Sequence, residues 1–152
     1  MIQDHITVKN RYKDFIKKIS ETETVYALKD ESGYATSYSS EIEYEDGEPA
    51  KIVCFWSDAA RAKSCVEQEW DHYEVSPVGL TEFIENWCLG MNNDGFIVGT
   101  NFDSNLIGYE AEPLEVILDS IEELRNTGKS LELRKFENMD DLENQIKEIL
   151  KD

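Results

Sequence analysis

The sequence predicts one α+β domain, with a mostly antiparallel or mixed sheet and helices packed mainly on one face. Strand-like segments follow one another as hairpin neighbours and helical segments interrupt them irregularly, unlike the strict alternation of a doubly wound fold. The chain has 152 residues, a common length for one domain. It shows no internal repeat and no linker rich in Gly, Pro or Ser, so we expect a single domain.

The first third of the chain predicts one helix followed by strands. Apolar residues at helical spacing predict an amphipathic helix over residues 4–20. Residues 24–28 and 34–38 are β-prone runs on either side of a turn containing Asp and Gly, which predicts a hairpin. Residues 41–49 are crowded with acids and predict an exposed loop or edge strand. Residues 51–56, which are apolar from Ile52 onward, predict a buried strand.

The middle third predicts two further helices with a short strand between them. Ser57 is expected to cap the first helix, because its hydroxyl can accept a free amide proton. The buried side of that helix is expected to comprise Ala59, Ala62, Val66, Trp70 and Tyr73. A strand over 73–78 is expected to end at Pro77. Thr81 is expected to cap the second helix, which precedes a turn at 92–95.

Two strands and a helix are expected next. Residues 96–102 and 108–112 have the composition of paired strands. Pro113 suits the first turn of a helix, and an apolar stripe continues from it to a stop at 126–128.

The end of the chain predicts a β-α appendix at about residues 129–152. Residues 131–136 alternate in the manner of a strand. Asn138 is expected to cap a final amphipathic helix.

Charge limits the partners of this chain. Fifteen Lys and Arg stand against thirty-three Asp and Glu, so the formal net charge is −18. Nucleic-acid binding draws its affinity from clustered Lys and Arg, and anionic membranes repel acidic surfaces, so neither is an expected partner. A basic protein is the expected partner, and the expected contact is an acidic face comprising Glu41, Glu43, Glu45, Asp46 and Glu48.

The cysteines and the N-terminus predict a reducing, cytoplasmic location. Cys54, Cys65 and Cys88 are odd in number and form no CxxC pair. The first residues lack the basic segment and apolar run of a signal peptide, and no stretch approaches the length of a membrane span.

Several separated motifs occur in an order that resembles a known bacterial family. The motifs are Phe55–Asp58, Cys65–Trp70, Phe83–Trp87, Met91–Gly95, Val98–Asn101 and Glu112–Leu114. Together they resemble domain of unknown function 2750 over about residues 11–124. The family is uncharacterised, so the resemblance implies no catalytic residues, and the segment after Gly128 departs from its compact pattern.

No motif for a cofactor, metal or nucleophile reaches the required spacing. Phosphate-binding glycine loops are absent, and no cofactor is predicted. Cys54, Cys65, His72 and Cys88 could supply zinc ligands by type, but they lack the close pairs of structural zinc sites. Cys65 and His72 are seven residues apart, about 10 Å along a helix, which is too far for a direct hydrogen bond. We expect the three cysteines to be core residues.

Three tryptophans offer a second kind of site. Trp56 and Trp70, with Glu69, could line a cleft for a small ligand, although their amphipathic positions favour core packing. Trp87 has the same two interpretations.

The leading hypothesis is a non-enzymatic protein-binding module, of which an immunity-type inhibitor of a basic toxin is one concrete version. The alternatives are a small-ligand-binding domain or unrecognised enzyme with a Trp- and Glu-lined cleft, and a structural or regulatory subunit.

Overall fold

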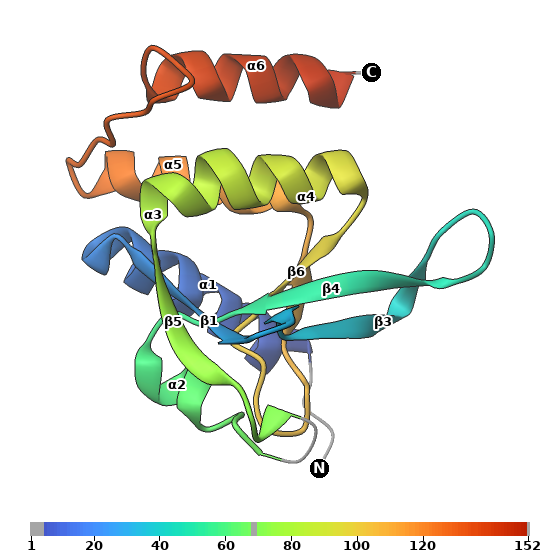
Figure 1. Cartoon of the computed structure of the whole chain (residues 1–152). Helices are drawn as coiled ribbons and strands as arrows, with labels where there is room; N and C mark the ends of the chain where they lie inside the picture. The colour runs from blue at the N-terminus through green and yellow to red at the C-terminus, as the bar shows by residue number, and fades with distance from the viewer. Residues whose placement is uncertain (1–4, 68–69, 152) are drawn as a thin grey trace.

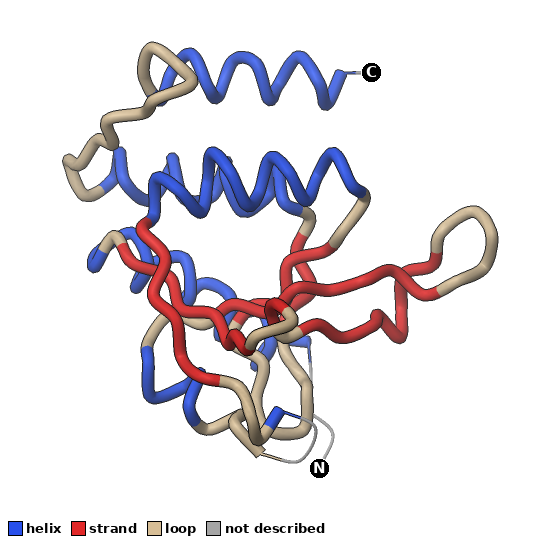
Figure 2. The backbone as a smooth tube through the Cα atoms, in the orientation of Figure 1, coloured by secondary structure: helices blue, strands red, loops and turns tan. Residues whose placement is uncertain are grey.

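Two sheets joined side by side form the middle layer of the molecule (Figures 1 and 2). This computed structural model describes residues 5–67 and 70–151. In chain order the elements are α1 (His5–Thr22), β1 (Thr24–Asp30), β2 (Gly33–Tyr34), β3 (Thr36–Glu43), β4 (Pro49–Phe55), α2 (Ala59–Lys63), β5 (Glu74–Gly79), α3 (Leu80–Glu82), the π-helical turn η2 (Phe83–Cys88), α4 (Leu89–Asp94), β6 (Ile97–Thr100), β7 (Tyr109–Ala111), α5 (Pro113–Asn126) and α6 (Met139–Lys151). The predicted α+β class is confirmed.

The strand order is β2-β1-β5 in one sheet and β3-β4-β6-β7 in the other. All pairs are antiparallel except β4 with β6, so the second sheet is mixed. Tyr26 and Trp56 exchange backbone hydrogen bonds of 2.8 Å in both directions, which ties β1 to the residue that follows β4.

Alternation along the central strands produces two apolar cores, one on each face of the sheets. Val53 and Phe55 contribute to the larger core, which α1, α5, α6 and the helical run 80–94 cover. Ile52 and Cys54 contribute to a smaller core on the other face, near α2. A strand buried on both faces needs apolar residues at every position, which is why 52–56 is a continuous apolar run.

The predicted hairpin between 24–28 and 34–38 is correct only at its turn. Lys29 pairs with Tyr34, but the chain then leaves β1, and Thr36 pairs with Val53 on β4. Residues 34–38 therefore link the two sheets.

The helix expected after Ser57 is shorter than predicted and has a different cap. Asp58 is the cap, since its side chain accepts a hydrogen bond of 2.8 Å from the Arg61 amide. Ser57 is buried instead, where its amide donates to Asn101 Oδ1 at 2.8 Å and its hydroxyl accepts from Asn101 Nδ2 at 3.0 Å. The apolar residues after Lys63 enter the smaller core from irregular chain.

The next strand and helix also extend past their predicted ends. Pro77 does not end β5, which continues to Gly79, because proline is tolerated on an edge strand. Gly79 rather than Thr81 is the residue before the helical run. That run continues through 92–94 and stops at Gly95, whose φ of 77° is the left-handed conformation glycine adopts readily.

The expected helices after Pro113 and Asn138 are confirmed. Pro113 opens α5, and Asn138 Oδ1 accepts a hydrogen bond of 2.8 Å from the Asp141 amide at the start of α6. None of the helices in the described ranges is long and apolar enough to cross a bilayer.

The strand predicted at 131–136 is wrong. The segment is irregular, and its amides bond to a side chain rather than to another strand: the Glu85 carboxylate, 3% exposed, accepts from the Arg134 amide at 2.7 Å. Leu131 and α6 then close over the larger core, where Leu142 and Ile146 are buried.

Candidate functional site

The five acids predicted to form a binding face lie together at the end of a projecting hairpin. Strands β3 and β4 extend beyond the helical layers, and the loop between them is the outermost part of the molecule on that side (Figure 1). We call residues 41–48 the acidic arm. All five carboxylate side chains of the arm are exposed: Glu41, Glu43, Glu45, Asp46 and Glu48.

Hydrogen bonds give the acidic arm a defined shape. The Ser39 hydroxyl is buried, and it accepts from the amides of Glu41 and Ile42 at 3.0 and 2.8 Å while donating to the Glu110 carboxylate. These bonds stabilise a bulge that breaks the β3–β4 register between Tyr38 and Glu43.

Tyr44 attaches the acidic arm to the body of the protein. Its hydroxyl donates to the Gly95 carbonyl and accepts from the Lys51 amide, both at 3.0 Å. The far end of the hairpin is closed by a bond of 2.8 Å from the Tyr44 amide to the Glu48 carbonyl. The arm is thus a pinned hairpin rather than a free loop.

The charge of the acidic arm is not neutralised locally. The segment 41–48 has five acids and no base, and no ion pair found within the described residues includes one of them. Carboxylates held on one hairpin without counter-charges create a local negative potential.

Positive charge is concentrated elsewhere, on α1. Over 5–22 this helix has five bases against two acids, a net of +3 with histidine neutral. Part of this charge faces acids: Lys13 and Lys17 share a hollow of about 400 Å³ with Asp119 and Glu122 of α5. The bases of α1 thus lie beside acids, whereas the segment 41–48 contains no base.

The predicted tryptophan cleft meets a different environment. Trp56 is 0% exposed and Trp70 is 7% exposed, their rings meet edge to face at 6.1 Å, and both belong to the smaller core. The Trp56 indole N–H donates to the Phe102 carbonyl at 2.8 Å. Glu69 lies outside the described residues. Trp87 is half-buried and packs against the larger core.

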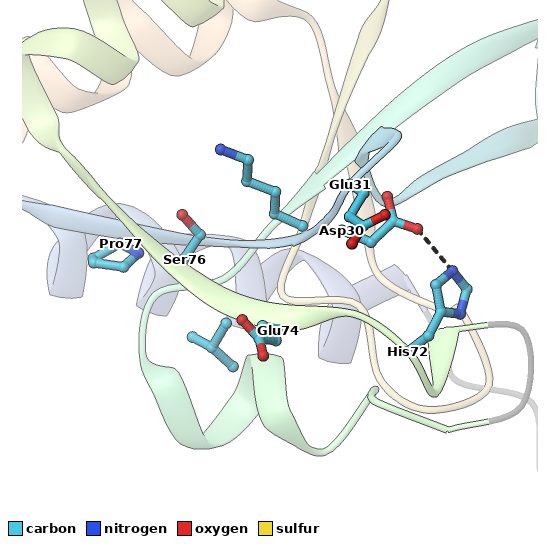
Figure 3. A pocket seen from close by; sticks show the side chains of 8 residues that line it. Asp30, Glu31, His72, Glu74, Ser76 and Pro77 are labelled. Carbon is cyan, nitrogen blue, oxygen red and sulfur yellow. Dashed lines mark ion pairs between the residues drawn. The ribbon is translucent and has the colours of Figure 1, made fainter.

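A pocket that the sequence does not predict lies at the far end of β1 and β5. It has a volume of about 690 Å³ and is lined by Lys29, Asp30, Glu31, His72, Glu74, Val75, Ser76 and Pro77. Figure 3 shows the His72 ring directed at the Asp30 carboxylate, and their Nε2–Oδ2 distance is 2.9 Å. The His72 ring also stacks on the Tyr73 ring, with 4.6 Å between ring centroids.

The Asp30 carboxylate in this pocket is held in its charged form. The Ser32 hydroxyl donates to it at 2.8 Å, the Ser32 and Gly33 amides at 2.9 and 3.0 Å, and these bonds lower the pKa of Asp30. The sequence pattern Asp-x-Ser-Gly at 30–33 is typical of such a turn. The pairing of Asp30 with His72, 42 residues away, leaves no pattern in the local sequence.

The cysteines are core residues, as predicted. All three are buried and free of disulfides. Cys65 Sγ contacts the Phe102 carbonyl at 3.2 Å, whereas His72 pairs with Asp30. Within residues 5–67 and 70–151, no three His, Cys, Asp or Glu side chains gather to hold a metal ion.

Comparison with known proteins identifies the family. A family model described as "Protein of unknown function (DUF2750)" matches residues 12–119, close to the stretch of about 11–124 predicted from the motifs. None of the curated proteins matches the chain. Among solved structures, "Anabaena Tic22 (protein transport)" matches at 14% sequence identity and a TM-score of 0.39. That match covers 82% of this chain and 57% of the other, so the chain spans little more than half that protein's length. Because the family match covers well over half of its residues, the chain belongs to the DUF2750 family of proteins of unknown function.

Proposed function

We propose that this protein is a non-enzymatic binding module whose acidic arm docks a basic surface of another protein. The observation that carries the proposal is five exposed carboxylates, without a local base, on a pinned and projecting hairpin. An immunity-type inhibitor of a basic toxin is one concrete version of this function.

Electrostatics explains what such an arm accomplishes. Opposite charge steers two proteins together and raises the association rate, and the effect weakens as salt screens it. Surface potential falls off over about 8 Å at physiological ionic strength, so charge on a projecting hairpin reaches a partner before the body does. Rigidity matters as well, because a hairpin that is already ordered loses less entropy on binding.

A charge-matched pair of variants tests the proposal. The first variant replaces the five arm acids with their amides, and the second does the same at Glu21, Glu31, Glu122, Glu132 and Glu137, which are exposed and lie outside the arm. Both variants carry a net charge of −13, five less negative than the parent.

Each protein is immobilised and incubated with lysate at about 50 mM and about 500 mM NaCl, and retained proteins are identified by mass spectrometry. We expect basic proteins to be retained at low salt by the parent and by the second variant, and to be lost from the arm variant. Retention of no basic protein by the parent, or equal losses from both variants, contradicts the proposal.

A second candidate function, binding of a small ligand, is supported by the pocket beside His72. A carboxylate–imidazole pair in an open pocket is an arrangement that ligand sites and acid–base catalysts use. Ligand screening by NMR, following the His72 ring signals, tests this function. A ligand that shifts those signals and no longer binds His72→Gln would favour it over protein binding.

A further inference from the structure

Four of the strands in the described part of the chain lie at sheet edges, and three of these four are shielded. β2 has only two residues and β7 only three, and β7 also contacts α1. β5 contains Pro77, which has no amide proton to donate, and it contacts α2. Natural proteins protect sheet edges in these ways, through short strands, proline and covering elements.

The fourth edge strand, β3, is different. It has eight residues and no proline, and among the described elements β4 is the one that it contacts extensively. Figure 1 shows it along the open side of the projecting hairpin. An edge strand of this kind presents backbone donors and acceptors to any segment that lies beside it.

The usable part of this edge is the stretch 36–40. Beyond it, the amides of Glu41 and Ile42 are already bonded to the Ser39 hydroxyl, so the bulge ends the regular edge. Within the stretch, Tyr38 is 63% exposed, which is unusual for so large a side chain. An added strand would find there both a backbone ladder and an aromatic side chain to pack against.

Charge decides which segment can add to β3. The acidic arm continues directly from the stretch 36–40, so a segment that pairs with this stretch and extends past residue 40 lies beside the carboxylates of the arm. Like charges facing each other across strands are destabilising, whereas opposite charges attract. A segment rich in lysine or arginine is therefore the occupant that complements this edge.

We propose that β3 accepts an added β-strand from an extended, lysine- or arginine-rich segment of a partner protein, with Thr36–Ser40 supplying the ladder and the acidic arm selecting the charge. The inference rests on the proposed function and specifies its binding mode. Backbone bonds would supply affinity that does not depend on the partner's sequence, and the arm would exclude neutral and acidic segments.

Synthetic peptides test the binding mode. The probe is a capped octapeptide alternating Lys and Val, and its charge control alternates Glu and Val. Two further probes keep the Lys–Val sequence but carry N-methyl groups on alternate residues, at odd positions in one and at even positions in the other. An added strand bonds through only one edge, so one methylation pattern blocks the ladder while the other leaves it intact.

We expect the Lys–Val peptide to bind at about 50 mM NaCl and the Glu–Val peptide not to bind. One methylated peptide should keep its affinity and the other should lose at least about tenfold, since each lost hydrogen bond removes about 1 kcal/mol. Hydrogen exchange should slow at residues 36–40 on binding, and Tyr38→Ala should weaken binding without changing the far-UV circular dichroism spectrum.

The remaining outcomes overturn the inference in distinguishable ways. Equal affinity of both methylated peptides would mean docking by charge alone, which overturns strand addition and leaves the proposed function standing. Absence of peptide binding, together with unchanged lysate capture by the arm variant, would overturn both. A dimer in solution that protects residues 36–40 would assign the edge to a second copy instead.

Discussion

The thiols of Cys54 and Cys88 lie in the two cores on opposite faces of the sheets, with almost no exposed surface. Burial raises the pKa of both thiols, because a thiolate would form where water cannot solvate it. Neither sulfur is therefore poised as a nucleophile, since the thiolate is the reactive form.

These two thiols predict how stability depends on pH. In the unfolded chain a thiol ionises near pH 8.5, whereas in the native protein it stays protonated well above that pH. The unfolded state then binds fewer protons, so the free energy of unfolding decreases as pH rises, by up to about 1.4 kcal/mol per pH unit for each thiol. Urea unfolding between pH 7.5 and 9.5 measures this slope, and Cys88→Ala should make it shallower. An unchanged slope in that variant would refute the assignment.

Residue types predicted some environments correctly and others not. The cysteines lie among apolar residues, and their burial followed from that pattern. The same pattern left both interpretations of the tryptophans open, and in the structure Trp56 and Trp70 are buried whereas Trp87 is half-buried. Ser57 lies where a serine hydroxyl commonly caps a helix. In the structure this hydroxyl instead accepts a hydrogen bond from Asn101 Nδ2, a residue that follows β6 and has a φ of 49°. A polar side chain with two suitable hydrogen-bond partners bonds to the partner that folding brings close. Sequence spacing does not reveal a partner that is distant in the chain.

At the scale of single elements, the packing of strand β6 requires glycine at position 99. A Cβ added at Gly99 would lie 2.8 Å from Ile52 Cγ2 and 3.1 Å from the Phe102 ring, so these two side chains occupy the space that a larger residue would need. Gly90, on α4, has nothing within 4 Å of the same position and an ordinary helical φ.

Alanine substitution at these two glycines should have opposite effects. Gly99→Ala forces neighbouring side chains to shift and should lower the free energy of unfolding by about 1–3 kcal/mol. Gly90→Ala should raise it by about 0.5–1 kcal/mol, because alanine favours the helix and restricts the unfolded chain. Thermal and urea unfolding of both variants check this pair. Two changes of the same sign would contradict the packing described for β6.

Elements were predicted best where one period persists over many residues. Helices α1, α5 and α6 match their apolar stripes to within about two residues, as strong 3.6-residue periodicity allows. The strand prediction at 131–136 was wrong because an alternating pattern shows only that one side of a segment is buried, and not that the segment pairs with another strand. Leu131 and Leu133 do contact the larger core, but the backbone between helices bonds to Glu85.

At the scale of the whole molecule, α6 packs over the larger core although it lies beyond the family match. Ile146 is 1% exposed in that core, whereas Ile149 is 51% exposed one turn later. Arg125 of α5 also pairs with Glu143 at 2.9 Å and with Asp140, which adds a polar contact to the same face. We expect the C-terminal segment and the rest of the chain to behave as one domain.

Two substitutions on α6 test that expectation. Ile146→Ala leaves a cavity and should lower the free energy of unfolding of the whole protein by about 2–5 kcal/mol, while Ile149→Ala should change it by less than about 0.5 kcal/mol. Tryptophan fluorescence reports on the body and hydrogen exchange on α6. Coincident destabilisation by both probes supports one domain. Loss of protection in α6 without a change in the fluorescence transition would show an independent appendix.

Composition and local pattern were enough for the class of fold, most helices, the burial of the cysteines, and the exposure of the acidic segment. These properties depend on solvation and on contacts between residues close in the chain, which periodicity reports directly. Strand order, the division into two cores and the pairing of His72 with Asp30 needed the three-dimensional arrangement. The open edge of β3 needed it too, because an edge is defined by the absence of a neighbour. Such features arise from contacts between segments tens of residues apart, whose free energies favour one arrangement only when the whole chain packs.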